Sequence, residues 1–496
     1  MSVIYNDTNR QVLPRCLTYA TACSLGLLRV IRKEEQFDKI ETTESDARKE
    51  WLENPRLAAA VDLVGEALIV KDFQSNEAIK AAKYIISKAP LSSLLIRQLA
   101  NHFLEEPASI WKESNQVPEA DAYREDIARL KLSVRNYPEN PLAWSDLSLS
   151  YATLGQTDKA KMAMLVASNL AGNNRFILRS ASRCYMHVGE PDRAVAILNK
   201  SGLCASDPWI ASAEIAIAES SGLKSKCLSK AKHLIDNGNL TAFSRSELAL
   251  SIGTIEIKSG SVRRAKKIIR QALIDPTENA LAQTEWAASM FNVDFYDLIG
   301  LRKTVPASYE ATAVYSFYNK EFAESLKASE KWGRFQFLSS RPIILSTFLS
   351  SCVLNDDLGA INIYNKAFPA QRASPLAINN YAFALARIGQ TDEAKKVLNR
   401  ALRYDPSREE QLAITATNGL ICFREGHVEE GRDFYKNAVR GFELIKGFRS
   451  AAIATYYWAL EEKRINSQIV KSKIMEAKRE IERHNVFELI DLAKKL

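Results

Sequence analysis

The chain has 496 residues, of which 46% are hydrophobic and 25% are charged. That balance is typical of folded proteins and excludes wholesale disorder. The chain has 19 glycines and 15 prolines, which is fewer than expected because these two residue types make up roughly 12% of an average protein. This scarcity disfavours β-sandwiches and barrels, which need frequent turns. The net charge is +8, with its positive excess after residue 140, which admits a nucleic-acid partner without requiring one.

The first 118 residues carry weaker patterns than the rest of the chain. Residues 1–54 are predicted to form an N-terminal segment: an extended stretch up to about residue 14, a helix over about 15–33 and a charged linker. Residues 55–118 are predicted to be helical, with a hairpin made by 57–71 and 76–89, and to be a diverged copy of the repeat that follows.

From Pro141 onward the sequence repeats itself with a period of 34 residues. A third clear copy begins at Pro375, and its turn Gly389–Ala394 nearly repeats the turn Gly155–Ala160. Apolar, small and glycine positions recur at the same offsets in all three copies. They are Trp144, Leu147, Ser148, Tyr151 and Gly155, then Leu178, Ala181, Ser182, Tyr185 and Gly189, then Ile378, Tyr381, Ala382, Leu385 and Gly389.

These residue types suit two helices packed through a tight turn. A small side chain such as Ser148 allows the two helix axes to approach closely. Gly155 favours the left-handed backbone that ends a helix, and Asp158 places a carboxylate near the free N–H groups of the next helix. The pattern therefore predicts a series of helical hairpins.

The 34-residue period and its positions resemble the tetratricopeptide repeat, a helix–turn–helix unit. This resemblance implies an all-α fold, a right-handed α-solenoid of stacked tetratricopeptide-like hairpins over residues 119–460. An irregular insertion is expected near 291–342, and capping helices are expected over 461–496. Such hairpins must stack because one hairpin alone cannot bury its apolar face.

The resemblance also implies an inner surface lined by the first helix of each hairpin. Carried over position by position, it predicts a basic group in the second copy and a mixed patch in the C-terminal half. The predicted partner-binding residues are Arg179, Arg183 and His187, and then Asn379, Phe383, Arg387 and Leu420. Flanking apolar positions of the same surface are Leu345, Leu349, Ala416 and Phe423.

Each group has two interpretations that the sequence leaves open. Arg179 and Arg183 could bind a carboxylate or phosphate through paired hydrogen bonds, or they could be solvated or pair with acidic neighbours in the array. Phe383 and Leu420 could receive the apolar face of a partner helix, or they could belong to the core, since a register error of one residue changes the face.

A basic run on the second helix of another hairpin is predicted to lie on the outer side. It could contact nucleic-acid phosphates or an acidic protein, or it could be an ordinary solvated face. Its members are Arg263, Arg264, Lys266, Lys267 and Arg270.

The sequence contains no nucleotide-binding loop, catalytic elbow or kinase motif. Its five histidines are scattered, so neither a metal site nor a cofactor is expected. The seven cysteines are odd in number and form no C-x-x-C pair, which predicts free buried thiols in a reducing, cytoplasmic compartment. No apolar run is long enough to span a membrane.

These observations favour a non-enzymatic interaction or scaffold protein that holds a peptide segment or partner subunit within a multi-protein assembly. One alternative is a nucleic-acid-associated regulator that uses the basic C-terminal two-thirds of the chain. Another is an effector with an unrecognised activity in residues 1–118, where the sequence leaves an enzyme open.

Overall fold

The computed structural model describes residues 10–19, 21–23, 25, 46–69, 72, 74–88, 94–104, 120–237, 240–293, 295 and 298–496. Within these residues every regular element is a helix and no residue lies in a strand. The all-α prediction is confirmed. The chain divides into two compact units, one made of residues 1–16, 120–303 and 307–496, the other of 17–119 and 304–306.

In the part of the smaller unit that the structure describes, several helices have defined bounds. They are α2 (Asp46–Glu53), α3 (Leu57–Ile69), α4 (Asn76–Ser87) and α5 (Leu94–Leu104). Helices α3 and α4 pack together where the sequence predicts a hairpin, and alanines such as Ala60 and Ala81 are fully buried between them. Residues 10–18 form no helix, so the helix expected over 15–33 does not begin at residue 15, and most of that range lies outside the described residues.

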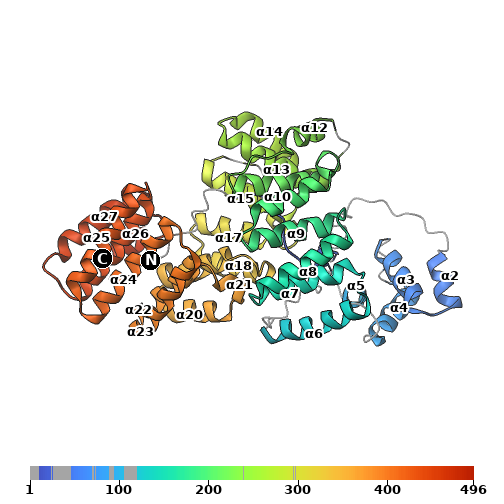
Figure 1. Cartoon of the computed structure of the whole chain (residues 1–496), viewed down its shortest axis with the longest axis horizontal. Coiled ribbons are helices and arrows are strands. Elements are labelled where there is room, and N and C mark those ends of the chain that lie inside the picture. Colours follow the sequence, from blue (N-terminus) through green and yellow to red (C-terminus); the bar gives the residue numbers. More distant parts are fainter. Residues whose placement is uncertain are drawn as a thin grey trace. The chain divides into compact units, whose positions relative to one another are not determined.

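The larger unit is an α-solenoid of consecutive hairpins (Figure 1). Its helices are α6 (Ala120–Asn136), α7 (Pro141–Thr153), α8 (Thr157–Leu170), α9 (Arg175–His187), α10 (Pro191–Lys200), α11 (Pro208–Ser220), α12 (Leu228–Asn237), α13 (Ala242–Lys258), α14 (Val262–Ala272), α15 (Glu278–Phe291), α16 (Leu298–Thr304), α17 (Tyr309–Tyr318), α18 (Phe322–Phe335), α19 (Arg341–Phe348), α20 (Asp357–Lys366), α21 (Pro369–Arg372), α22 (Pro375–Arg387), α23 (Thr391–Ala401), α24 (Arg408–Glu425), α25 (Val428–Leu444), α26 (Phe448–Arg464), α27 (Val470–Arg483) and α28 (Ile490–Lys494), with short turns η3 (Leu203–Ala205), η4 (Leu349–Val353) and η5 (Leu402–Tyr404).

The first helices of successive hairpins also contact one another, so that α11, α13, α15 and α17 form a continuous row. Gly155, Gly189 and Gly389 have φ angles of 72°, 78° and 86°, as the turn positions require. The residue before the second helix makes no side-chain cap at α8, α10 and α23, whereas Asp356 caps α20. Asp158 therefore acts through its charge in the first turn rather than as a capping group.

Side-chain caps also occur at the first helices α7, α9 and α11. The side chain of Asn140 accepts hydrogen bonds from the start of α7, and Asn174 and Asp207 do the same for α9 and α11. The Asn or Asp directly before each of these three helices was the available signal.

The loop over 333–342, expected to be an insertion, connects distant repeats of the larger unit. Tyr123 of α6 packs edge-on against Phe337 and Phe368, with ring centroids 5.8 and 5.1 Å apart. Helix α21 contacts α7 nearby. The first hairpins and the middle of the solenoid therefore share one hydrophobic cluster, which also includes Cys16.

Cysteine pairing departs from the sequence prediction. Cys204 in η3 and Cys227, just before α12, form a disulfide, so the expectation of seven free thiols is wrong. The pairing follows from the packing of α10, α11 and α12, which brings together two cysteines 23 residues apart. Cys16, Cys184, Cys352 and Cys422 are free and buried, and Cys23 is free and partly buried.

Membrane crossing requires a long, apolar helix. Among the helices that the structure describes, none has both the length and the apolar character.

Close helix packing in the α24/α25 hairpin gives a stability prediction. A Cβ added at Gly419 would lie 2.9 Å from Cδ2 of Tyr435 and 3.1 Å from the carbonyl oxygen of Gly431. Gly419→Ala must therefore push the two helices apart, and we expect it to lower the free energy of unfolding by about 1–3 kcal/mol.

Urea unfolding followed by circular dichroism measures this loss. Gly65→Ala in α3 is the matched control, because no atom lies within 4 Å of the added Cβ, and a helical Gly→Ala change there should be neutral or slightly stabilising. Equal stability of Gly419→Ala and the wild-type chain would contradict the close approach of α24 and α25.

Candidate functional site

The predicted basic group on α9 is only partly available to a partner. Arg179 donates from Nη2 to Oε2 of Glu247 at 2.7 Å and from Nη1 to the carbonyl oxygen of Trp209 at 3.0 Å. Its guanidinium also stacks over the Trp209 ring. The interpretation in which Arg179 pairs within the array therefore describes this structure.

Arg183 and His187 lie further along α9 in a desolvated environment. Burial lowers the pKa of Arg183, and the positive charges of Arg15 and Arg341 lower it further. Burial and the neighbouring Arg183 together lower the pKa of His187 to about 4. A hydrogen bond to the backbone of Leu338 opposes this shift. His187 is therefore neutral near pH 7 and helps to seat the 333–342 loop.

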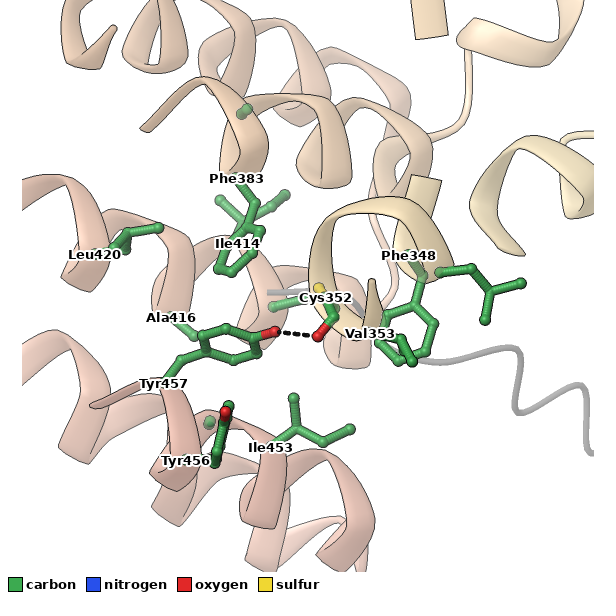
Figure 2. Close-up of a cluster of buried hydrophobic side chains, with 14 of the residues drawn as sticks. Phe348, Cys352, Val353, Phe383, Ile414, Ala416, Leu420, Ile453, Tyr456 and Tyr457 are labelled. Atoms are coloured by element: carbon green, nitrogen blue, oxygen red, sulfur yellow. Dashed lines mark hydrogen bonds between the residues drawn. The ribbon is translucent and has the colours of Figure 1, made fainter. Parts of the chain in front are cut away.

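The apolar members of the mixed patch, Phe383 and Leu420, belong to the core that Figure 2 shows. Phe383 and Leu420 are each 1% exposed. The Phe383 ring packs edge-on against Tyr457, whose hydroxyl donates to the carbonyl oxygen of Cys352 at 3.1 Å. The flanking positions of the predicted surface are buried too, namely Leu345, Leu349, Ala416 and Phe423. The expectation of an open apolar surface is wrong for these residues.

The polar members of the same patch are engaged within the solenoid. Asn379 is fully buried and accepts a hydrogen bond from Oγ1 of Thr417 at 2.8 Å. Arg387 donates from Nε to Oδ2 of Asp357 at 2.9 Å. Periodicity alone did not show that α26 covers this face, because α26 lies two hairpins further along the chain than α22.

The predicted outer basic patch is on α14, the second helix of its hairpin. Its side chains are largely exposed, with Lys266 partly buried: Arg263, Arg264, Lys266, Lys267 and Arg270. Nη1 of Arg264 lies 3.9 Å from Oε1 of Glu256. This surface can offer positive charge to a phosphate or an acidic side chain.

The structure places a stretch of the chain without regular secondary structure on the first-helix row. We call residues 10–16 the N-terminal segment. It lies against Glu278, Asn279 and Gln283 of α15 and Glu310 of α17, which we call the acceptor face. Arg10, Gln11 and Val12 are at most 4% exposed, so the segment is enclosed rather than laid on the surface.

Arg10 makes the most complete set of contacts. Its Nε and Nη2 donate to the two carboxylate oxygens of Glu310 at 2.9 and 3.0 Å. Nη2 also donates to Oδ1 of Asn279 at 3.2 Å, and Nη1 donates to Oε1 of Gln283. Such a bidentate pair fixes the orientation of the guanidinium as well as its charge.

Arg15 reaches the same carboxylate from the other end of the segment. Its Nη2 donates to Oε2 of Glu310 at 2.6 Å, and its Nε donates to Oε1 of Glu278 at 3.1 Å. Gln336 accepts from Nη1 at 2.7 Å. Arg341 also donates to Glu310, at 2.6 Å, so three arginines share one carboxylate.

Two side-chain amides hold the backbone of the segment. Nδ2 of Asn279 donates to the carbonyl oxygen of Leu13, and Nε2 of Gln283 donates to that of Arg10, both at 3.0 Å. Every residue type carries this carbonyl, so the amides contact the backbone whatever its sequence, whereas the carboxylates contact the arginine side chains.

The charge states follow from burial and pairing. Burial alone would raise the pKa of Glu310, but Arg10, Arg341 and Arg15 hold it well below the ordinary value. Burial raises the pKa of Glu278, with Arg15 opposing and the nearby Glu247 and Glu310 adding to the rise. Glu310 is therefore the fixed negative charge of the acceptor face, and Glu278 depends on a cation beside it.

Sequence reasoning predicted an extended stretch near the N-terminus but did not name the acceptor face. The available signal was a first helix that carries Glu278, Asn279 and Gln283 where apolar residues usually lie. Across the described residues, no group of three or more His, Cys, Asp or Glu side chains is arranged to hold a metal ion.

A family model described as tetratricopeptide repeat matches residues 377–408, which fall in the copy that begins at Pro375. The α22/α23 hairpin in that range is one of the stacked hairpins of the larger unit. Residues 377–408 therefore form a tetratricopeptide repeat.

Several solved structures are similar to this chain. Yeast Tom70 has 14% identity and a TM-score of 0.32, with 88% of this chain and 94% of that chain covered. The human IFIT1 dimer with PPP-AAAA has 14% identity and a TM-score of 0.35, with 85% and 94% covered. The Cut9–Hcn1 hetero-tetramer of the APC/C has 11% identity and a TM-score of 0.27, with 92% and 99% covered. A comparison with curated protein sequences finds no match.

The low pKa of His187 predicts a loss of stability in mild acid. Its ordinary pKa is 6.5 and its folded value is about 4, so between these values the unfolded chain takes up a proton that the folded chain does not. Lowering the pH from 7 to 5 should therefore cost about 2 kcal/mol through this group.

Urea unfolding at both pH values measures the cost, and His187→Gln should remove it while still donating to Leu338. His427→Gln is the control, because the His427 side chain is 65% exposed and its replacement leaves His187 in place. A wild-type pH dependence that persists in His187→Gln would show that His187 does not carry it.

Proposed function

We propose that this tetratricopeptide-repeat protein is a non-enzymatic interaction protein that binds an extended segment of a partner protein on its first-helix row, within a multi-protein assembly. The observation that carries the proposal is the acceptor face with an extended segment bound to it. Asn279 and Gln283 donate to two backbone carbonyls of that segment, which is how a surface recognises a polypeptide main chain.

The chemistry of the acceptor face is that of binding. Its carboxylates are held in ion pairs with guanidinium groups, and its amides are held in hydrogen bonds to a backbone. Paired charges of this kind give specificity for a partner because an unpaired buried carboxylate is costly. The fold supplies the rest, since a row of first helices offers the same kind of position in each hairpin.

A second candidate function is supported by the exposed basic side chains of α14. Arg263, Arg264, Lys267 and Arg270 lie on one short helix and are all exposed. Such a cluster can neutralise several phosphates, and binding would then weaken steeply with salt. No aromatic side chain is interleaved in this helix, so the surface suits phosphate contacts rather than base stacking.

A cytoplasmic location is a weaker part of the proposal. The sequence favoured it because seven free cysteines suit a reducing compartment. The disulfide between Cys204 and Cys227 counts against that reason, since disulfides are rare in such compartments.

Photo-cross-linking in cells tests which surface meets the partner. A photoreactive benzoylphenylalanine replaces Gln336, which is partly exposed and accepts from Arg15 beside the acceptor face. The matched control carries it in place of the exposed Lys267 on α14. We expect a partner polypeptide, identified by mass spectrometry, to be cross-linked at least several-fold more from position 336 than from position 267.

The opposite pattern favours the second candidate. Cross-links from position 267 to nucleic acid, lost after nuclease treatment and between 50 and 200 mM salt, would assign the function to α14. Equal cross-linking of one partner protein from both positions would reject the first-helix row as the specific surface.

A further inference from the structure

We propose that the acceptor face is a recognition site for extended segments that carry two arginines five residues apart, and that residues 10–16 are an intramolecular ligand that competes with the partner. This inference rests on the proposed function and names both the class of partner and the control of access to the site. The carrying observation is that Arg10 and Arg15 converge on Glu310.

The charge of the acceptor face specifies a basic partner. Glu278 and Glu310 are 9% and 2% exposed, and among the described residues Arg15 is the one cation paired with Glu278. When the segment leaves, Glu310 loses two of its three arginines and keeps Arg341. Since buried carboxylates need compensating charge, the segment that replaces residues 10–16 must bring positive groups to the same places.

The geometry specifies arginine over lysine. Arg10 uses two nitrogens for the two oxygens of Glu310 and a third for Gln283. Arg15 uses its three nitrogens on Glu278, Gln336 and Glu310. A lysine ammonium is a compact point charge without a planar donor group, so it cannot donate to these separate acceptors in the same geometry.

The spacing follows from the shared carboxylate. Five residues of fully extended chain span at most roughly 18 Å, and both guanidinium groups must still reach Glu310. Both guanidinium groups can reach Glu310 only if the two side chains are long and point toward each other along the segment. The two backbone carbonyls held by Gln283 and Asn279, those of Arg10 and Leu13, fix the register of the segment between them.

Tethering makes the segment a competitor rather than a passive filler. A segment on the same chain is present at an effective concentration set by its linker, often in the millimolar range. A separate partner must compete with this tethered segment. Its apparent affinity therefore equals its intrinsic affinity multiplied by the fraction of molecules whose acceptor face is free. Weakening the hold on residues 10–16 should therefore raise the affinity for an external segment of the same chemistry.

Fluorescence polarisation with a labelled synthetic peptide tests this directly. The peptide carries residues 8–18 of the chain, with serine in place of Cys16, and it is titrated with full-length protein. We expect the full-length Arg10→Ala/Arg15→Ala variant to bind the peptide at least tenfold more tightly than the wild-type chain. A peptide with lysine at both arginine positions should bind that variant at least tenfold more weakly.

Arg263→Ala/Arg264→Ala is the matched control, because it removes two exposed arginines from α14 and should bind the peptide like the wild-type chain. If loss of Arg10 and Arg15 unfolds the protein, a protease site inserted after Thr18 keeps every native residue and is cut after folding. The labelled peptide should then exchange with the freed segment in the cut protein and not in the uncut one.

Three results would overturn the inference: equal peptide affinity for the wild-type chain and the double variant, no binding to either the double variant or the cut protein, or indifference to lysine. The proposed function fails separately. A partner cross-linked from position 336 while the peptide never binds would leave the proposed function and reject the inference. Tight, arginine-dependent peptide binding without a partner cross-linked from position 336 would support the inference and reject the proposed function.

Discussion

A helical hairpin cannot bury its apolar side alone, and the architecture of the larger unit follows from that constraint. First helices such as α7, α9, α13, α22 and α24 contact both their own second helix and the first helix of the next hairpin. Close contacts of this kind require small residues at the crossing points. Ser148 is fully buried and donates to the carbonyl oxygen of Ala160, and Gly419 faces Gly431 across the α24/α25 hairpin.

The row of first helices is also where the solenoid tolerates buried charge. Glu310 is almost fully buried, yet Arg10, Arg15 and Arg341 keep it ionised. Two of these arginines come from a segment nearly three hundred residues earlier in the chain. The N-terminal segment therefore supplies two of the three cations that pair with this buried carboxylate.

The candidate site shows where sequence reasoning reached its limit. The repeat placed Arg179, Phe383 and Leu420 on a first-helix surface, but position in a repeat does not reveal what covers it. Phe383 is enclosed by Tyr457 from α26, and Arg179 is paired with Glu247. Both covering groups come from hairpins that are distant in sequence, so no local pattern could have named them.

The sequence by itself determined the all-α fold and the tetratricopeptide family, because turn glycines, small crossing residues and apolar periodicity are local properties that recur every 34 residues. It also marked the basic helix α14, whose exposure follows from its place as a second helix. Only the tertiary structure decided which residues line the first-helix row, that Cys204 pairs with Cys227, and that residues 10–16 lie on α15 and α17. These features depend on contacts between residues far apart in the chain, and the free energy of such contacts is set by the packed arrangement rather than by any short stretch of sequence.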